Sequence, residues 1–303
     1  MKKEAKRRLV SEIMGRCRID RQDSFRISEH ETSWEGIEEI KKLNEQKLNK
    51  KAKKLIKKNL KELTEVQELL YASSKYSLLI IFQAMDAAGK DGTIKHVMSG
   101  INPQGCEVYS FKKPSAEELA HNYLWRYTKR MPEYGRIGIF NRSYFEEVLV
   151  LKVHPELLPN PNPDQEFWNE RYEDIRNMEK HLTRNRTVII KFFLHLSKEE
   201  QKRRFLERLN DPTKNWKFSI NDLAERKKWD DYQKAFEDAI NATASPDAPW
   251  YVVPADNKWI MRMIVSTVIT ETILALNLEY PEVPKDMKKV LDEAKKELEQ
   301  KDV

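Results

Sequence analysis

The stretch QAMDAAGKDGTIK, residues 83–95, combines a glycine–lysine pair with two carboxylates, Asp86 and Asp91. Its central octet aligns with the phosphate-loop (Walker A) pattern G-x-x-x-x-G-K-[ST], matching at Gly89 and Lys90 and departing at both ends. An apolar run, SLLIIF, precedes it and a helical pattern follows it. A strand–loop–helix unit directs backbone N–H groups and a helix N-terminus at one point, which favours bound phosphate. The stretch therefore predicts a phosphate-binding loop, with a plain glycine turn as the alternative.

The carboxylates in this loop require an explanation, because phosphate oxygens repel them. Asp91 would lie in the first helical turn, where the helix dipole favours a negative side chain. Asp86 lies inside the loop, where its carboxylate would repel phosphate oxygens. This repulsion disappears if Mg²⁺ lies between the carboxylate and the phosphate, since Mg²⁺ binds one or two carboxylates together with phosphate oxygens. We predict that Asp86 binds Mg²⁺ and that Lys90 contacts phosphate. The remaining predicted phosphate-contacting residues of the loop are Ala87, Ala88, Gly89, Asp91, Gly92 and Thr93.

A second candidate element follows the apolar run at residues 136–140. Phosphate-loop proteins usually end a strand at this place with a metal-binding aspartate. Here the residue is Asn141, which is neutral, so Asp86 would meet most of the metal charge. Arg142 follows and would point toward the transferring phosphoryl group. We predict catalytic roles for both; the alternative is an ordinary turn after a strand.

A third element runs from Ser197 to Leu223. Ser197 and Glu200 form a capping-box pattern, and a cationic helix then leads to a break at 210–212. Such a segment could close over phosphates as a lid at about 198–224 and exclude water. The alternative is a solvated basic helix offset by its own glutamates. The basic side chains expected to contact phosphate are Arg203, Arg204, Arg208, Lys214 and Lys217.

Alternating apolar runs and helical patterns indicate an α/β layer fold from residue 75 onward. Nearly uninterrupted apolar strands are typical of a parallel sheet buried on both faces. The expected strands are Ser77–Gln83, Glu107–Phe111, Arg136–Phe140, Thr187–Leu194 and Trp250–Val253. The expected helices are 91–100, 115–130, 143–152, 164–184, 198–209, 222–242 and 257–277.

The chain divides into three expected parts. Residues 1–74 are expected to contain an arm over 1–30, where no clear period occurs. A capping box at Thr32–Glu35 then begins one long amphipathic helix, or two in succession, reaching Tyr71. Residues 75–280 form the core with its lid, and 281–303 a surface helix. The long helix is lysine-dense in its middle, which suggests a solvated outer face, or else a lipid- or nucleic-acid-binding face.

Composition bounds the class of protein. The chain has 303 residues, 40% hydrophobic and 34% charged, with a net charge of +6, so it is globular and favours an acidic partner. Cys17 and Cys106 lack metal-ligand spacing and suit a reducing cytoplasm. The basic N-terminus lacks an apolar h-region, so we expect no secretory signal. The apolar segment 259–278 contains Arg262 and Glu271, which favours a buried helix over a membrane span.

Three motifs in this order resemble the polyphosphate kinase 2 family: MDAAGKDGTIKHVMSGINPQG, IFNRSYFEEVLVLKVHPELL and RRFLERLNDPTKNWK. The resemblance extends over residues 19–278, and Asn141 with VLVLKVHPELL is similar to the class III branch. It implies a thymidylate-kinase-like P-loop fold, with a parallel five-stranded sheet flanked by helices and topped by a helical lid. It also implies phosphoryl transfer from inorganic polyphosphate to AMP and ADP, giving ADP and ATP, with Mg²⁺.

Carried onto matching positions, the resemblance implies that Asp86 and Asn141 hold magnesium, while Lys90, Arg142, Arg204 and Arg208 meet phosphate or nucleotide. A long polyanionic donor would also account for basic residues expected to line a channel, namely Lys112, Lys113, Lys129 and Arg130. We expect a cytoplasmic homo-oligomer, dimer or tetramer, without nucleic-acid or membrane partners. Two alternatives remain: an ATP-dependent nucleotide or nucleoside kinase, and a non-catalytic binder of nucleic acid or lipid.

Overall fold

Six strands of the described residues, 3–34 and 45–299, form one sheet in this computed structural model. Their order across the sheet is β1-β6-β5-β2-β4-β3, and all neighbours are parallel except β1 and β6. The strands are β1 (Arg18–Ile19), β2 (Ser77–Gln83), β3 (Cys106–Ser110), β4 (Ile137–Asn141), β5 (Thr187–His195) and β6 (Trp250–Pro254).

The five predicted strands are present, each within one residue of its expected bounds. The prediction of a purely parallel, five-stranded sheet is wrong, because β1 adds an antiparallel edge through the pairs Arg18↔Tyr251 and Ile19↔Trp250. A strand of two residues is too short to show the alternation by which strands are recognised in a sequence.

The helices of the described residues largely follow the expected pattern. Two predicted helices are divided: 115–130 becomes α5 and α6, and 222–242 becomes α10 and α11. The first break follows Asn122, whose side chain caps Leu124 N–H, and the second lies at Lys228, which leaves helical geometry at ψ 24°. The α-helices are α1 (Lys3–Cys17), α3 (Glu45–Ser73), α4 (Lys90–Val97), α5 (Ala116–Leu119), α6 (Trp125–Thr128), α7 (Glu146–Val153), α8 (Gln165–Arg184), α9 (Lys198–Asn210), α10 (Ile220–Lys227), α11 (Trp229–Thr243), α12 (Lys258–Leu274) and α13 (Lys285–Glu299). Short 3₁₀ turns are η1 (Ile27–Glu29), η2 (Pro103–Gly105), η3 (Pro155–Leu157) and η4 (Asn215–Lys217).

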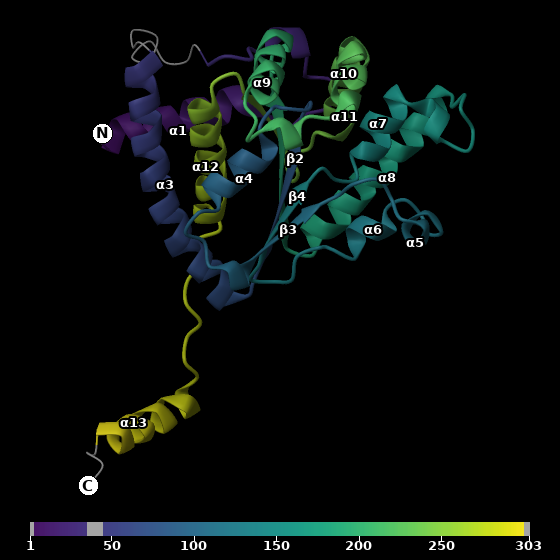
Figure 1. The fold of residues 1–303 in the computed structure, drawn as a ribbon. Coiled ribbons are helices and arrows are strands. Elements are labelled where there is room, and N and C mark those ends of the chain that lie inside the picture. Colours follow the sequence, from purple (N-terminus) through teal and green to yellow (C-terminus); the bar gives the residue numbers. More distant parts are fainter. Residues whose placement is uncertain (1–2, 35–44, 300–303) are drawn as a thin grey trace.

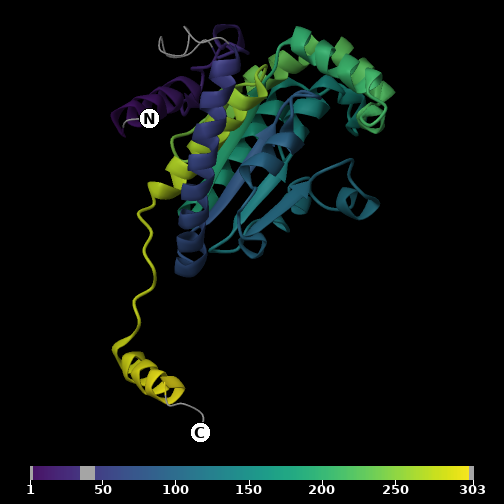
Figure 2. The ribbon, with the colours of Figure 1, turned by 60° about the vertical axis from the view of Figure 1, so that its left-hand side comes forward.

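Helices cover both faces of the sheet (Figures 1 and 2). Side chains of β2 alternate between two hydrophobic cores: Leu78 and Ile80 pack with α1, α3, α4 and α12, whereas Leu79 and Ile81 pack with α7, α8 and α11. Because both faces are buried, the strand is apolar at successive positions, as a parallel sheet requires.

The N-terminal segment expected to be an arm is in part a packed element. In α1, Leu9, Ile13 and Cys17 are buried against the α12 side of the sheet. Beyond β1, Phe25 is fully buried, and its backbone exchanges two hydrogen bonds of 2.9 Å with the Asn241 side chain. The Glu35 end of the predicted capping box and the expected helix over 36–44 lie outside the described residues.

Helix α12, the apolar segment considered as a membrane span, is a core helix between α3 and α4. Its hydroxyl groups meet a polar partner: Asn59 of α3 donates to Ser266 at 3.1 Å and to Thr267 at 2.8 Å. Within residues 3–34 and 45–299, no helix combines the length and apolarity that a bilayer crossing demands. Helix α13 lies apart from the body at the end of an extended segment (Figure 1).

The parallel strands β2, β3, β4 and β5 all end at one edge of the sheet. The chain order reverses at β2, since β4 and β3 lie on one side of it and β5 and β6 on the other. Ligands of open α/β sheets bind in the crevice at such a reversal, beyond the carboxyl ends of the strands. The fold therefore positions the residues after β2 and β4 to form a site.

Candidate active site

The loop between β2 and α4 wraps tightly around a central point. Two of its residues adopt left-handed backbone geometry: Ala87 at φ 64° and Gly89 at φ 103°. A side chain at Gly89 would be strained by this φ, and its Cβ would lie 3.4 Å from Met261. Thr93 N–H donates to Gly89 O at 2.9 Å, which starts helix α4 directly at the loop. This is the strand–loop–helix unit that the sequence predicts.

Lys90 curls back over the loop. Its Nζ donates to Ala84 O at 3.0 Å, at the start of the same loop. Burial lowers the pKa of Lys90, and the nearby Arg142 lowers it further, while Asp86 and Glu146 act in the opposite direction. An anionic ligand in the loop would compensate for this loss of solvation, because it favours the charged amine.

Arg142 links the loop to the end of β4. Phe82 of β2 pairs with Asn141 of β4, so Arg142, the next residue, lies beside the loop. The backbone of Arg142 adopts the left-handed conformation, with φ at 64°. One guanidinium nitrogen lies 3.1 Å from Asp86 Oδ1 and another 3.4 Å from Glu146 Oε2. Burial raises the pKa of Glu146, although Arg142 and Lys90 oppose this effect. These charged groups converge on one spot, and nothing in the spacing of the sequence identified Glu146.

Asn141 makes its contacts with its amide nitrogen. Nδ2 donates to Asp91 Oδ1 at 2.6 Å and to Ser110 Oγ at 3.4 Å, so it joins β4 to α4 and β3. No donor of the described residues occupies Asn141 Oδ1, and this oxygen is free to accept. The predicted roles of Asn141 and Asp91 toward metal and phosphate stay predictions.

Arg204 of the lid helix α9 supports the loop from behind. Its side chain is only 4% exposed, and its guanidinium donates to the carbonyl oxygens of Ala87 and Ala88 at 3.0 and 2.8 Å. The other terminal nitrogen donates to Ala255 O at 2.6 Å, and Nε donates to Glu200 at 2.7 Å. These contacts position the loop backbone. The expected contact of Arg204 with nucleotide or polyphosphate stays a prediction.

The capping-box pattern at the start of α9 is satisfied in one half. Ser197 Oγ accepts from Glu200 N–H at 3.1 Å, as predicted. The reciprocal partner differs, because Ser197 N–H donates to Asp256 at 2.8 Å while the Glu200 carboxylate binds Arg203 and Arg204. Arg203 also pairs with Glu207 and lies on the exposed side of the helix.

A cavity of about 790 Å³, here called the loop cavity, lies between the loop, the ends of β3 and β4, the lid and the start of α12. The predicted phosphate-loop, strand-end and lid residues line it except Thr93, whose side chain is buried against Met261, and Arg203. Of the four basic residues expected to line a channel, Lys112 and Lys113 do so, whereas Lys129 and Arg130 do not line this cavity and lie over the rings of Trp125 and Tyr109. Of the lid residues, Arg208 pairs with Asp222 at 3.5 Å and Lys214 with Asp211 at 2.6 Å. The structure thus brings segments far apart in the sequence around one basic space.

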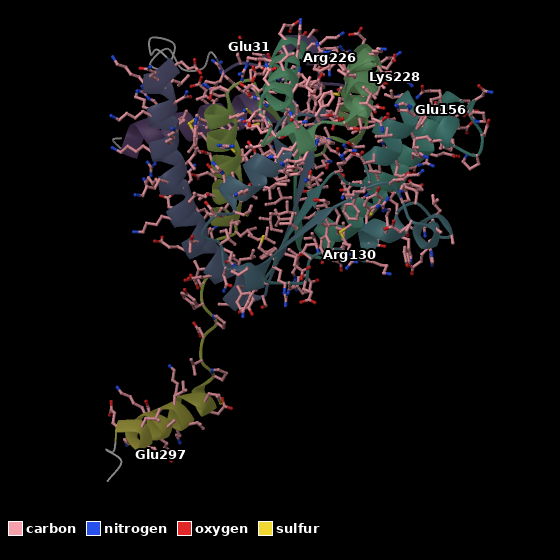
Figure 3. All side chains as sticks on the ribbon, in the orientation of Figure 1. Glu31, Arg130, Glu156, Arg226, Lys228 and Glu297 are labelled. Atoms are coloured by element: carbon pink, nitrogen blue, oxygen red, sulfur yellow. The ribbon has the colours of Figure 1, made fainter. Side chains whose placement is uncertain are left out.

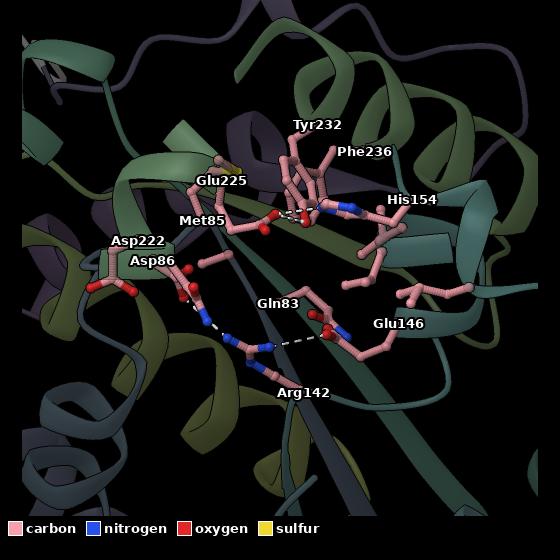
Figure 4. A pocket seen from close by; sticks show the side chains of 15 residues that line it. Gln83, Met85, Asp86, Arg142, Glu146, His154, Asp222, Glu225, Tyr232 and Phe236 are labelled. Carbon is pink, nitrogen blue, oxygen red and sulfur yellow. Dashed lines mark hydrogen bonds and ion pairs between the residues drawn. The ribbon is translucent and has the colours of Figure 1, made fainter. Parts of the chain in front are cut away.

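A smaller cavity of about 390 Å³, here called the side cavity, adjoins the loop cavity and shares Asp86, Arg142 and Asp222 with it (Figure 4). Tyr232 and Phe236 of α11 form one wall. The remaining lining residues are Gln83, Ala84, Met85, Glu146, Leu149, Val150, His154, Leu157, Asn221 and Glu225.

His154 and Glu225 connect the side cavity to the lid. Glu225 of α10 accepts from Tyr232 at 2.6 Å and lies 2.9 Å from His154 Nε2, while Glu156 lies 2.8 Å from Nδ1. Burial lowers the pKa of His154, but the hydrogen bonds to Glu225 and Glu156 outweigh it and raise the pKa overall. Lys228, between α10 and α11, approaches the same ring at 3.2 Å. Figure 3 labels Lys228 and Glu156.

Several lining residues of the loop cavity were absent from the sequence-based prediction: Ser110, Phe111, Glu207, Trp216, Asp222, Lys258, Met261 and Arg262. Lys258 and Arg262 are four residues apart in the first turns of α12, directly after β6. The rule that strand ends meet at one edge could have drawn attention to them. Arg262 was instead weighed only as a charge within a possible membrane segment.

The residues present fit a magnesium ion that is shared with a substrate. The Asp86 carboxylate is 30% exposed at the junction of the two cavities, and Asn141 offers a free amide oxygen in the loop cavity. No cluster of three His, Cys, Asp or Glu residues occurs in the described part of the chain, so the protein alone offers no cage. That arrangement suits Mg²⁺, which takes few protein ligands and completes its shell with phosphate and water.

Comparison with known proteins gives concordant matches. The family model described as Polyphosphate kinase 2 (PPK2) matches residues 45–281. A Rhodopseudomonas palustris protein named ADP-polyphosphate phosphotransferase is 55% identical over 250 residues, 80% of this chain and 86% of its own length. A Meiothermus ruber protein named AMP/ADP-polyphosphate phosphotransferase is 46% identical over 77% of this chain and 85% of its own.

The crystal structure of Polyphosphate Kinase 2 from Arthrobacter aurescens TC1 has a similar fold. Its TM-score is 0.80 at 35% identity, and the match covers 90% of this chain and 94% of that one. The loop, the second strand end and the lid lie together in space within the matched range 45–281. The chain belongs to the polyphosphate kinase 2 family.

Proposed function

We propose that the protein transfers phosphoryl groups from inorganic polyphosphate to AMP and ADP, giving ADP and ATP. The observation that carries this proposal is the loop cavity, where a phosphate loop and basic residues from four separate elements surround one space. A chain of phosphates fits such a cavity better than a single phosphate group would. Family membership and the printed activities of the two relatives support the same reaction.

The two adjoining cavities suggest separate places for the two substrates. Polyphosphate would occupy the loop cavity, with its reacting end at Lys90 and Arg142. The nucleotide would occupy the side cavity, where Tyr232 and Phe236 offer a wall for the base. The shared residues Asp86 and Arg142 would then lie beside the transferring group. Transfer would proceed in line between the two phosphates.

The acceptor oxygen of AMP or ADP is already an anion, so no general base is required. The contribution of the protein is then positioning and the neutralisation of charge by Lys90 and Arg142. Asp86 and Asn141 would hold Mg²⁺, which when bound neutralises part of the phosphate charge. Arg204 keeps the carbonyl groups of Ala87 and Ala88 turned away from the ligand by holding them in hydrogen bonds.

A donor exchange tests this function. The purified protein with AMP or ADP, Mg²⁺ and polyphosphate should form ATP, measured with luciferase, and ATP as donor to AMP should not replace polyphosphate. Phosphorylation of AMP by ATP alone would instead favour an ATP-dependent nucleotide kinase. Lys90→Ala should abolish turnover while circular dichroism shows the fold intact.

We also propose a cytoplasmic dimer or tetramer. Both cysteines are unpaired, which suits a reducing compartment. Assembly is supported by α13, which exposes Met287, Val290, Leu291 and Leu298 on one face. A helix of 15 residues is marginal in water without a partner for such a face. Light scattering on the full chain and on a chain ending before residue 285 tests this assembly.

A further inference from the structure

A row of cations leads from the loop cavity to the lysine-dense helix α3, and among the described residues only Lys258 of this row pairs with a carboxylate, that of Glu207 at 3.9 Å. It starts at Lys258 and Arg262 of α12, passes Lys95 of α4 and continues along Lys50, Lys53 and Lys57 of α3. We call these six residues the outer basic surface. In Figure 2, α3 crosses in front of α12 and α4 lies beside it.

Trp259 joins the two ends of this surface. Arg262 lies 4.9 Å from the centre of its ring and Lys53 lies 4.3 Å from the same centre, so both cations share one indole. His96 of α4 packs on the ring at 5.8 Å. Cations that contact an aromatic ring are held in place without being neutralised, and each can still receive an anion.

Arg262 is the link to the loop cavity. It lines that cavity, and its Nη2 lies 3.3 Å from where a Cβ at Gly92 would be. Its buried Nε has no hydrogen-bond partner among the described residues. Desolvation lowers the pKa of Arg262, and the neighbouring Arg204 lowers it further.

Three lysines of α3 form a stripe along one side of the helix. Lys50, Lys53 and Lys57 follow helical spacing on the flank toward α4, and none of them pairs with a carboxylate of the described residues. Their opposite-flank neighbour Lys58 does pair, with Glu62 at 3.6 Å. Burial lowers the pKa of His96, and the nearby Arg262 and Lys95 lower it further.

We propose that the outer basic surface binds the distal part of a long polyphosphate chain whose reacting end lies in the loop cavity. The occupant is a polyphosphate because the surface is continuous with the proposed donor site and complements a linear polyanion in charge. This proposal rests on the proposed function. It predicts that the enzyme prefers long donor chains, since only these reach from the loop to α3.

The test compares two double variants of the full chain, each losing two charges from α3. K53Q/K57Q removes the stripe, and K51Q/K58Q removes two exposed lysines on the opposite flank. We expect K53Q/K57Q to raise KM for long-chain polyphosphate about three- to tenfold, with kcat and KM for tripolyphosphate unchanged. K51Q/K58Q should match the original protein with both donors. The proposal would be overturned if the two variants had equal KM values for long-chain polyphosphate. It would also be overturned if K53Q/K57Q raised KM for tripolyphosphate as much as KM for the long chain.

Calorimetric binding of long-chain polyphosphate without nucleotide separates this proposal from the proposed function. If no donor supports ATP formation, the proposed function fails. The outer basic surface is still supported as a polyphosphate site if K53Q/K57Q, and not K51Q/K58Q, binds polyphosphate more weakly and with a smaller salt dependence. A single-stranded oligonucleotide of equal charge is the competitor. Displacement of polyphosphate by this oligonucleotide at equal concentration would assign the surface to nucleic acid and overturn the proposal.

Discussion

Asp86 and Arg142 face each other across 3.1 Å, which joins the phosphate loop to the end of strand β4. The loop carboxylate is thus balanced by a cation from the neighbouring strand. Arg142 also approaches Glu146 at 3.4 Å, and it keeps one carboxylate partner if Asp86 turns toward a metal. The pair explains how a phosphate-binding loop tolerates an acid, and it places both groups at the junction of the two cavities.

Asp86→Asn should lower kcat by about 10²- to 10³-fold, because the amide keeps the shape of the side chain but loses its charge toward Mg²⁺. The free energy of unfolding should change by less than about 1 kcal/mol, since the ion pair with Arg142 is partly exposed. Steady-state kinetics over a range of Mg²⁺ concentrations, with urea unfolding in parallel, measures both quantities. Asp292→Asn, at an exposed position of the separate helix α13, is the control, and full activity of Asp86→Asn would contradict the assignment.

Arg204→Lys should destabilise the protein by about 2–4 kcal/mol, because one ammonium cannot satisfy the carbonyl oxygens of Ala87, Ala88 and Ala255 together. kcat should fall as well, since the loop backbone loses its support. Urea unfolding and steady-state kinetics are the measurements. The neighbouring Arg203→Lys changes an exposed ion pair and should alter stability by less than about 0.5 kcal/mol. Equal stability of the two variants would show that Arg204 does not position the loop.

The sequence predicted the parts of the fold that are set by local pattern. β2 was assigned correctly because seven successive buried residues leave an unmistakable apolar run between a turn and a loop. Asn141 and Arg142 were placed beside the loop by analogy with phosphate-loop proteins, which end a strand at this point with a metal-binding residue, and the pairing of β2 with β4 puts them there. The first inference needed only periodicity, and the second needed a comparison of motifs.

Features that depend on tertiary contacts were not predictable from the sequence. The two-residue β1 forms only because β6 offers it an edge. Arg204 resembles any basic lid residue in the sequence, and only its burial and its carbonyl partners separate it from the exposed Arg203. The rule that strand ends meet at one edge points to the residues after β6, but only the packing of α12 beside Gly92 shows that Arg262 reaches the loop cavity.

Lys191 and Glu179 form a buried ion pair on the α8 side of the sheet, with Nζ 2.7 Å from Oε2 and side-chain exposures of 0% and 3%. Lys191→Met should cost about 3–5 kcal/mol in urea unfolding, because it leaves a buried carboxylate uncompensated. Adding Glu179→Gln should recover part of this loss, since an amide can still accept from Tyr144, which donates to Glu179 at 2.8 Å. A double variant less stable than Lys191→Met would contradict this account.

The contact between His154 and the lid should weaken as pH rises. The pKa of His154 is raised above its ordinary 6.5 in the folded protein, where Glu225 and Glu156 face the ring and Lys228 opposes them. The stabilisation from the charged ring is therefore complete below about pH 6.5 and is lost as pH rises through the folded pKa. Amides of α10 should exchange faster at about pH 8 than at about pH 6, after correction for intrinsic rates, and His154→Gln should remove this difference. The control His121→Gln, which is remote from α10, should leave the difference between the two pH values unchanged. If the difference persists in His154→Gln, the pH dependence comes from another titrating group, because the imidazole that pairs with Glu225 is then absent.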